Sequence, residues 1–278
     1  MMVKVRDVMT RDVICAEIPG KRDDALDLLR KHGISGAPVV KKGTRELVGV
    51  VSVEDLLMKP DEDQLAMLMT RSPCTIGPDE DISEAARKMV EKKIRRLPVV
   101  EDNKVVGIIS VRDIINKMAD FDIKSPVRDC VGKRISAVWE ETPVTVALAI
   151  MKLSKSRVLP VLDSEGRMVG VIDQSDIISS SRVVEESKIS SLSAPIEGEE
   201  WSWDSNTLLY ITKKLLKLPD TPVKSVMTKK VVTATQETSI SECARRMRQH
   251  DIENLFILEE GDIPIGIIRD IDLLRGIT

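Results

Sequence analysis

The side chains best suited to chemistry are two adjacent arginines and two serine–aspartate pairs. Arg95 and Arg96 precede an apolar stretch, and Ser52 and Ser110 each stand three residues before an aspartate. Arginine presents a rigid fork of donors that matches the oxygens of a phosphate. A serine followed by a first-turn aspartate supplies hydrogen-bonding oxygens, but it is also a common way to begin a helix. These residues therefore indicate either an anion-binding cleft or polar helix ends that face water.

The sequence offers little for catalysis or for metal binding. No nucleophile stands beside a base, no Walker-type phosphate loop occurs, and no metal-ligand spacing is found. The four cysteines are far apart and form no Cys-x-x-Cys pair, which favours a reduced, cytoplasmic protein. We therefore expect a protein that is not an enzyme, that binds no metal and that needs no obligatory cofactor.

Composition argues against two classes of partner. The 278 residues are 42% hydrophobic and 31% charged, and their net charge is −3. These values fit a globular domain protein and make nucleic acid an unlikely partner, since a nucleic-acid binder is expected to be basic. No apolar run is long enough to span a membrane, and the first residues lack the apolar core of a signal peptide. We expect no membrane contact.

The serine–aspartate pairs belong to a stretch that occurs four times. Gly-Val-Val-Ser-Val-Glu-Asp at 49–55 recurs as Gly-Ile-Ile-Ser-Val-Arg-Asp at 107–113, and altered copies stand at 170–176 and 266–272. Each copy indicates a short buried strand that turns into a helix. Upstream of each copy, a helical apolar stripe and a further strand complete the order strand, helix, strand, strand, helix. Four copies therefore predict four structural repeats.

One repeat is too small to bury a core alone, so we expect the repeats to share cores in pairs. The first module is predicted at 1–120 and the second at 121–278. The four repeats are predicted at 4–60, 65–120, 127–181 and 223–278. The fold class is therefore α+β.

The second module contains an insertion at 182–222. We predict a loop and then an amphipathic helix that runs from Leu208 to Leu218, stops at Pro219 and packs on the second module. Trp201 and Trp203 could anchor the insertion to its own domain or meet a partner. The sequence does not decide between these roles.

The repeats resemble the cystathionine-β-synthase (CBS) domain. The marks are the opening Val-Met-Thr, the Leu-Pro-Val-Val strand, and the step Gly-h-h-Ser-x-x-Asp, in which h is apolar. This resemblance covers nearly the whole chain outside the insertion. It implies that two CBS motifs form a pseudo-twofold Bateman module, a regulatory unit whose clefts bind adenosyl ligands. Four motifs in one chain resemble the γ subunits of AMP-activated protein kinase and their stand-alone prokaryotic relatives.

The resemblance implies that each cleft joins the Ser and Asp of one motif to strand residues of its partner. The first cleft has every part: Asp55 would accept hydrogen bonds from ribose, and Arg95 and Arg96 would hold phosphate. Its predicted residues are Ser52, Asp55, Thr75, Ile76, Arg95, Arg96, Leu97 and Pro98. The second cleft lacks the arginine pair, although Arg112 is near, and suits a less anionic ligand. Its predicted residues are Ser110, Asp113, Ile14, Cys15, Gly36, Ala37 and Pro38.

The clefts of the second module are less complete. The third keeps one phosphate arginine but has arginine in place of the serine. Its predicted residues are Ala137, Val138, Arg157, Leu159, Arg269 and Asp272. The fourth would join Asp173 and Asp176 to Glu253 and Asn254, and its carboxylates would repel phosphate. We expect the fourth cleft to be empty or repurposed.

The predicted function is a non-catalytic sensor of AMP, ADP or ATP. Ligand binding would rearrange the module, and an effector protein that the sequence does not identify would detect the change. A sensor of an S-adenosylmethionine-type ligand is one alternative. A structural or assembly protein with vestigial clefts is another, and the module faces are candidates for homodimer formation.

Overall fold

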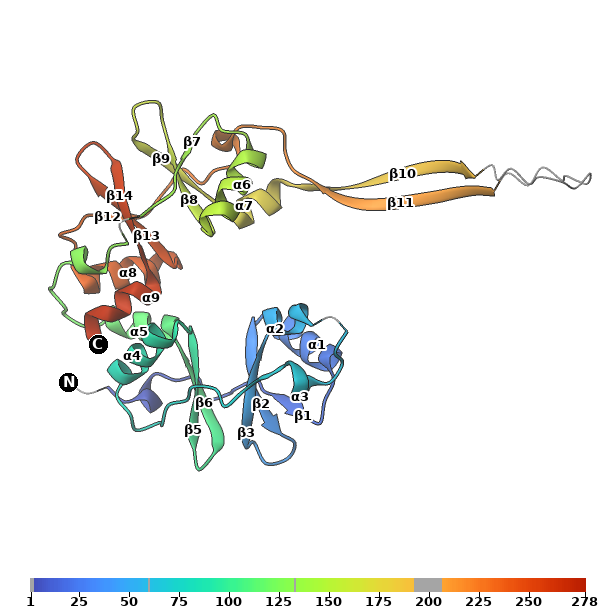
Figure 1. Ribbon diagram of the computed structural model, residues 1–278. Helices are drawn as coiled ribbons and strands as arrows, with labels where there is room; N and C mark the ends of the chain where they lie inside the picture. Colours follow the sequence, from blue (N-terminus) through green and yellow to red (C-terminus); the bar gives the residue numbers. More distant parts are fainter. Residues whose placement is uncertain (1–2, 60, 133, 193–206) are drawn as a thin grey trace, which may run out of the picture. The chain divides into compact units, whose positions relative to one another are not determined.

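The computed structural model describes residues 3–59, 61–132, 134–192 and 207–278, with the backbone alone for 183–192 and 207–216 (Figure 1). The elements follow one order four times: an extended segment or short strand, a helix, an antiparallel strand pair and a closing helix. The predicted α+β fold with four repeats is therefore confirmed. We number these repeats motifs 1 to 4 along the chain.

The bounds of the elements show how closely the motifs match. Motif 1 consists of η1 (Val5–Asp7), β1 (Ala16–Ile18), α1 (Arg22–His32), β2 (Gly36–Lys41), β3 (Leu47–Ser52) and α2 (Val53–Met58). Motif 2 consists of α3 (Leu65–Leu68), β4 (Thr70–Arg71), α4 (Ile82–Lys92), β5 (Arg96–Glu101), β6 (Lys104–Ser110) and α5 (Val111–Met118).

The second half repeats the order with one addition. Motif 3 consists of η2 (Val127–Cys130), β7 (Val138–Trp139), α6 (Val144–Ser154), β8 (Val158–Leu162), β9 (Met168–Asp173) and α7 (Gln174–Ser180). The added strands β10 (Arg182–Leu192) and β11 (Thr207–Lys217) follow it. Motif 4 consists of η3 (Val223–Ser225), β12 (Thr233–Ala234), α8 (Ile240–His250), β13 (Asn254–Glu259), β14 (Ile263–Arg269), α9 (Asp270–Leu273) and η4 (Leu274–Ile277).

The first helix of every motif ends in the same way. The residue after each helix has a left-handed backbone, with φ between 53° and 61° at Gly33, Lys93, Lys155 and Asp251. This conformation satisfies the last carbonyls of the helix and turns the chain into the next strand. The crossover makes the flanking strands parallel, as in β1–β2 and β7–β8, whereas the tight turn makes β2–β3 and β8–β9 antiparallel.

The motifs of a pair exchange their opening segments. Thr70 at the start of motif 2 pairs with Val50 in β3 of motif 1, and Thr10 of motif 1 exchanges two backbone hydrogen bonds with Ile108 in β6 of motif 2. The second half repeats this pattern, because Thr228 pairs with Val171 and Gly132 pairs with Ile267.

This exchange explains the glycine that begins each repeated stretch. A Cβ at Gly49 would lie 2.8 Å from both Met69 Sδ and the carbonyl oxygen of Thr70. At Gly170 it would lie 2.7 Å from Met227 Sδ. The opening Val-Met-Thr and the glycine of the closing step are thus the two sides of one contact.

The chain forms two compact units. The first comprises Met1–Lys133, Val232–Ile257 and Gly266–Thr278, and the second comprises Arg134–Val231 and Leu258–Ile265. In the first unit, α5 packs against α8 and α9, and α4 packs against η4 (Figure 1). Motifs 2 and 4 thereby share a helical core. Its buried side chains include Ile114, Ile115, Met118, Cys243, Ala244, Met247, Leu273 and Leu274.

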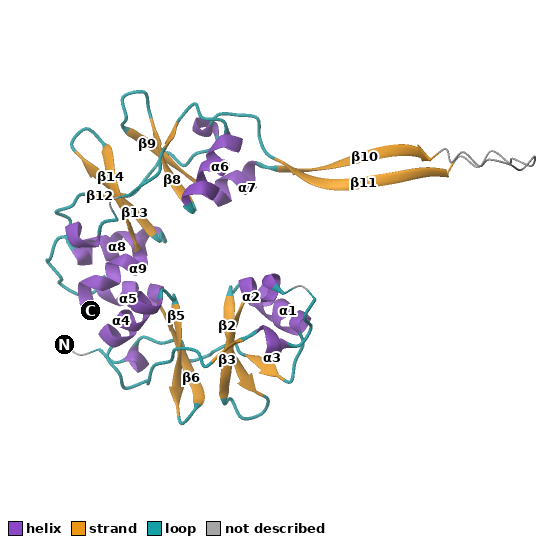
Figure 2. Cartoon of the chain, viewed as in Figure 1, coloured by secondary structure: helices purple, strands orange, loops and turns teal. Residues whose placement is uncertain are grey.

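The structure corrects the prediction for the insertion. The helix predicted from Leu208 to Leu218 is wrong, because β11 pairs antiparallel with β10 over their full lengths, from Arg182–Lys217 to Leu192–Thr207 (Figure 2). Thr207, Tyr210 and Thr212 favour strands, and a cross-strand partner at every position outweighs the helical spacing of the leucines. The predictions for Trp201 and Trp203 lie outside the described residues.

No helix in the described ranges has the length and apolarity needed to cross a membrane.

Candidate functional site

The serine–aspartate pairs of motifs 1 and 2 have one geometry. The backbone N–H of Ser52 donates to Asp55 Oδ2 at 2.8 Å and its hydroxyl donates to the same oxygen at 2.6 Å; both distances recur between Ser110 and Asp113. In return, the N–H of Asp55 donates to Ser52 Oγ at 3.2 Å. The pairs are therefore helix caps. Within the described part of the chain, both hydrogen bonds to the Asp55 carboxylate go to Oδ2, so Oδ1 is open to a ligand.

A second repeated bond places a side chain beside each cap. The first residue of the closing helix donates its N–H to a carbonyl in the loop before the central strand, from Val53 to Ser35 at 3.0 Å and from Val111 to Arg95 at 3.0 Å. The equivalent bond in motif 4 runs from Asp270 to Glu253 at 2.8 Å. Ser35, Arg95 and Glu253 thus occupy equivalent positions, and the repeat leaves the charge at this position free to vary.

The first cleft has a volume of about 480 Å³ and lies between motifs 1 and 2. Five of its predicted residues line it, namely Ser52, Asp55, Arg95, Arg96 and Pro98. Ile76 and Leu97 instead are buried in the core, and the carbonyl oxygen of Thr75 accepts a hydrogen bond from Lys88 at 3.2 Å. The apolar walls include Ala37, Pro38, Val50, Val51, Ile94 and Ile108.

The second cleft is smaller, about 230 Å³, and lies against the cap of motif 2. Of its predicted residues, Ile14, Gly36, Ser110 and Asp113 line it. Ala37 and Pro38 line the first cleft instead, and the thiol of Cys15 donates to the carbonyl oxygen of Val13 at 3.6 Å. Burial raises the pKa of Cys15, although Arg45 opposes the shift.

Arg96 lines both clefts, which the sequence did not predict. Its guanidinium donates to Ser35 Oγ at 2.8 Å, and it forms no ion pair with any residue that the structure describes. Arg96 is therefore a cation available to an anionic ligand in either cleft. The second cleft also contains Asp12, so its charges are mixed.

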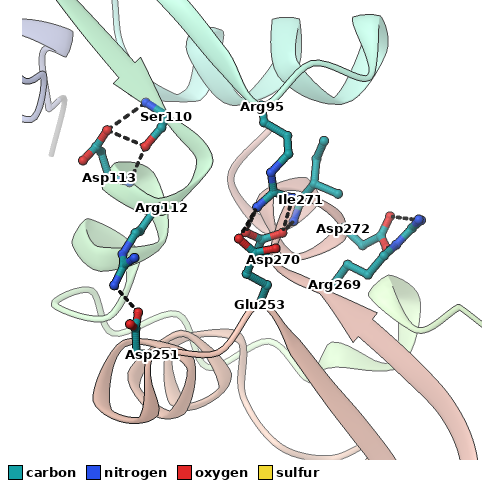
Figure 3. A network of polar contacts seen from close by, with 10 residues as sticks. All are labelled: Arg95, Ser110, Arg112, Asp113, Asp251, Glu253, Arg269, Asp270, Ile271 and Asp272. Carbon is teal, nitrogen blue, oxygen red and sulfur yellow. Dashed lines mark hydrogen bonds and ion pairs between the residues drawn. The ribbon is translucent and has the colours of Figure 1, made fainter. Parts of the chain in front are cut away.

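Arg95 has different surroundings, although it also lines the first cleft. Its Nη1 and Nη2 donate to the two oxygens of Asp270 at 3.0 and 2.6 Å, and Nη2 lies 3.1 Å from Glu253 Oε1 (Figure 3). Partial burial lowers the pKa of Arg95, but the hydrogen bond and charge of Asp270 outweigh it and the pKa is raised. Arg95, which was predicted to bind phosphate, is thus held by two carboxylates of motif 4.

Arg112 is also held by motif 4. Its guanidinium forms an ion pair with Asp251 at the end of α8 (Figure 3). A small cavity of about 110 Å³ lies between the two groups of ion pairs, and Arg112, Asp251, Glu253 and Asp270 line it. Arg112, predicted to lie near the second cleft, therefore contacts the helices of motif 4.

Motif 4 differs most from the repeat pattern. Arg269 replaces the capping serine, and its Nε donates to Asp272 Oδ2 at 2.6 Å while its Nη2 donates to Oδ1 at 3.3 Å. This bond to Asp272 raises the pKa of Arg269. Both oxygens of the predicted ribose acceptor are therefore occupied by a side chain of the same motif.

The third and fourth clefts would each combine residues of the first unit with residues of the second, so both clefts stay predictions. Val138 and Leu159 are buried in the second unit. Asp173 accepts a hydrogen bond from the N–H of Ser175 at 2.8 Å as the cap of α7.

Sequence reasoning missed Asp270, whose side chain is only 6% exposed. The equivalent residue is Val53 in motif 1, Val111 in motif 2 and Gln174 in motif 3. An acid at a position that is apolar in two sister repeats was the available signal.

The chain is similar to a known domain family along most of its length. The model of the CBS domain matches residues 5–62, 65–120, 127–182 and 223–278, close to the four predicted motifs. The uncharacterized protein MJ1404 of Methanocaldococcus jannaschii is 25% identical over 281 residues, which cover 99% of this chain and 62% of that protein. The chain thus spans less than two thirds of this relative.

Two solved structures have the same fold over nearly the whole chain. An uncharacterized conserved protein from Pyrococcus horikoshii is 28% identical, covers 99% of this chain and 100% of its own, and has a TM-score of 0.71. Protein MJ1225 from Methanocaldococcus jannaschii, which has been proposed as an archaeal homolog of g-AMPK, has a TM-score of 0.63 with the same coverage. At 20% identity this second likeness concerns the fold alone. With four domain matches that span most of its length, the chain belongs to the CBS domain family.

Proposed function

We propose that this protein is a non-catalytic sensor that binds an adenine nucleotide in the first cleft and transmits its occupancy to another protein. The observation that carries the proposal is the composition of the cleft: an open Asp55 oxygen, two arginines and apolar walls around about 480 Å³. Such a volume falls within the range of small-molecule sites.

The parts of the cleft match the parts of a nucleotide. Asp55 offers Oδ1 as a charged acceptor for ribose hydroxyls, and Val50, Val51 and Ile94 offer apolar contact for a base. Arg96 offers a donor fork that no carboxylate in the described part of the chain occupies. These features support AMP, ADP or ATP as the ligand class.

The test is calorimetric titration of the full chain with AMP, ATP and adenosine, and of the variants Asp55→Asn and Asp113→Asn. Asp55→Asn removes a charged acceptor from the first cleft and is expected to weaken AMP binding by about tenfold or more, because a hydrogen bond to a charged group contributes roughly 1.5–3 kcal/mol. Asp113→Asn makes the same change in the second cleft and is the matched control. Equal AMP affinities in Asp55→Asn and wild type would remove Asp55 from the site.

A second ligand class is favoured by one observation in the second cleft. Asp12 and Asp113 both line it, so two carboxylates face the single cation Arg96 among its described lining residues. A ligand that carries positive charge, such as S-adenosylmethionine, suits this arrangement better than AMP does. Titration of the Asp55→Asn variant with S-adenosylmethionine tests it, and no heat of binding would reject it.

A further inference from the structure

Asp270 is a buried carboxylate that the fold of the repeat does not require. Its position begins the closing helix, where motifs 1 and 2 have valine. Its backbone N–H still makes the repeated bond to the loop carbonyl, of Glu253 in this motif. Burial of an unpaired carboxylate is costly, and here the charge is balanced by Arg95, with a further hydrogen bond from the N–H of Ile271 at 2.7 Å.

Arg95 cannot give the same donors to two anions at once. Both of its terminal nitrogens donate to Asp270, and Nη2 also lies within 3.1 Å of Glu253. The Arg95 side chain is 45% exposed and lines the first cleft, so a ligand there can approach it. A phosphate that takes the Nη1–Nη2 fork of Arg95 has to displace the carboxylate of Asp270.

We propose that Asp270 determines the phosphate selectivity of the first cleft by competing with ligand phosphate for Arg95. The inference rests on the proposed function and deepens it. Asp270 belongs to α9, which packs on α5 of motif 2. Release of Arg95 leaves a buried carboxylate without its main partner, and this destabilises the packing of motif 4 on motif 2. By linkage, whatever loosens that packing also strengthens phosphate binding.

The ligand that displaces Asp270 is defined by charge. Adenosine has no phosphate and leaves the Arg95–Asp270 pair intact. AMP gains from Arg95 only the difference between its own phosphate and the carboxylate that it replaces. The wild-type cleft therefore prefers AMP over adenosine by less than its two arginines imply. The remaining free energy of the contact between Arg95 and phosphate goes into moving motif 4.

The experiment compares AMP with adenosine by calorimetric titration of three full-length proteins: wild type, Asp270→Asn and Asp251→Asn. In Asp270→Asn, AMP is expected to bind about tenfold more tightly, because a charge-assisted competitor is lost, whereas adenosine affinity should change by less than about twofold. Asp251→Asn removes a different ion pair between motif 4 and motif 2, made with Arg112, which does not line the first cleft. Both side chains of that pair are largely exposed, at 68% and 72%, so its loss should loosen the packing of motif 4 very little. This matched control should therefore leave the ratio of AMP to adenosine affinity nearly unchanged.

A second measurement reads the coupling directly. AMP, but not adenosine, should increase hydrogen exchange of the backbone amides of 270–277 in the wild type. An unchanged affinity ratio in Asp270→Asn would overturn the inference and leave the proposed function standing. Absence of both AMP and adenosine binding in all three proteins would overturn the proposed function, and this inference with it.

Discussion

Motifs 1 and 2 begin their closing helices identically, yet the two helices end in different surroundings. The bonds of Ser52 to Asp55 and of Ser110 to Asp113 have the same lengths, 2.8 and 2.6 Å. Two residues after each aspartate, the apolar side chain is 69% exposed in motif 1, at Leu57, and 3% exposed in motif 2, at Ile115. The difference arises because α5 packs against α8 and α9.

This contrast separates the chemistry of a cleft from its connection to the rest of the protein. The cap is made within four residues, so both motifs have it. Contact with motif 4 requires helices far away in the sequence, and in the first unit it is made by Arg95, Arg112 and Ile115 of motif 2. On the proposed function, a signal from the first cleft would therefore pass through motif 2.

The largest expected effect tests the burial on which this contrast depends. Ile115→Ala should lower the free energy of unfolding by about 2–4 kcal/mol, since it leaves a cavity between packed helices. Leu57→Ala, the matched change in motif 1, should cost less than about 1 kcal/mol because the side chain is mostly in water. Urea denaturation followed by circular dichroism gives both values. A cost for Leu57→Ala as large as that for Ile115→Ala would show that the Leu57 side chain has a packing partner.

The division between local and distant contacts also explains what the sequence predicted. The four motifs and their caps follow from short repeated patterns, because each is built by neighbours in the chain. The resemblance to the CBS domain, rather than the repeat itself, implies that Asp55 and Arg96 line the first cleft. The bidentate partner of Arg95 is Asp270, 175 residues away, and no local pattern connects them. The hairpin of β10 and β11 was missed for a similar reason, since cross-strand pairing decided between two conformations that the leucines alone left open.

The next prediction concerns a feature that both motifs share, the contact between the glycine of one motif and the opening segment of the other. Gly49→Ala should lower the free energy of unfolding by about 1–3 kcal/mol, because its Cβ would meet the backbone oxygen of Thr70, which cannot move without disturbing the strand pair. Gly107→Ala should cost less, since the three atoms nearest to its Cβ all belong to the flexible side chain of Met9.

The control for both glycine variants is Gly77→Ala. Its Cβ would lie 3.4 Å from Glu80 Oε1, an ordinary contact, and its backbone φ is not positive. The alanine there should be neutral or add roughly 0.4–1 kcal/mol by reducing the freedom of the unfolded chain. Denaturation midpoints of the three variants, measured together, check the order. An equal loss of stability in Gly49→Ala and Gly107→Ala would mean that the opening segment shifts to make room for the added Cβ in both variants.

The smallest expected effect concerns the thiol on the helix that helps to bury Ile115. Cys243 lies in α8, and burial raises its pKa to about 12. An unfolded cysteine has a pKa of about 8.5, so as the pH rises the unfolded chain loses this proton first. The contribution of the thiol to stability is therefore complete below about pH 8.5 and falls as the pH rises toward 12. Between pH 7 and pH 9 the loss is about 0.4–0.8 kcal/mol. Urea denaturation of the wild type and Cys243→Ala at both pH values, under reducing conditions, should show their difference in stability shrinking by that amount. A difference independent of pH would mean that the thiol ionises as freely in the folded protein as in water, and that α8 does not seal the face of motif 2 through which we expect the signal to pass.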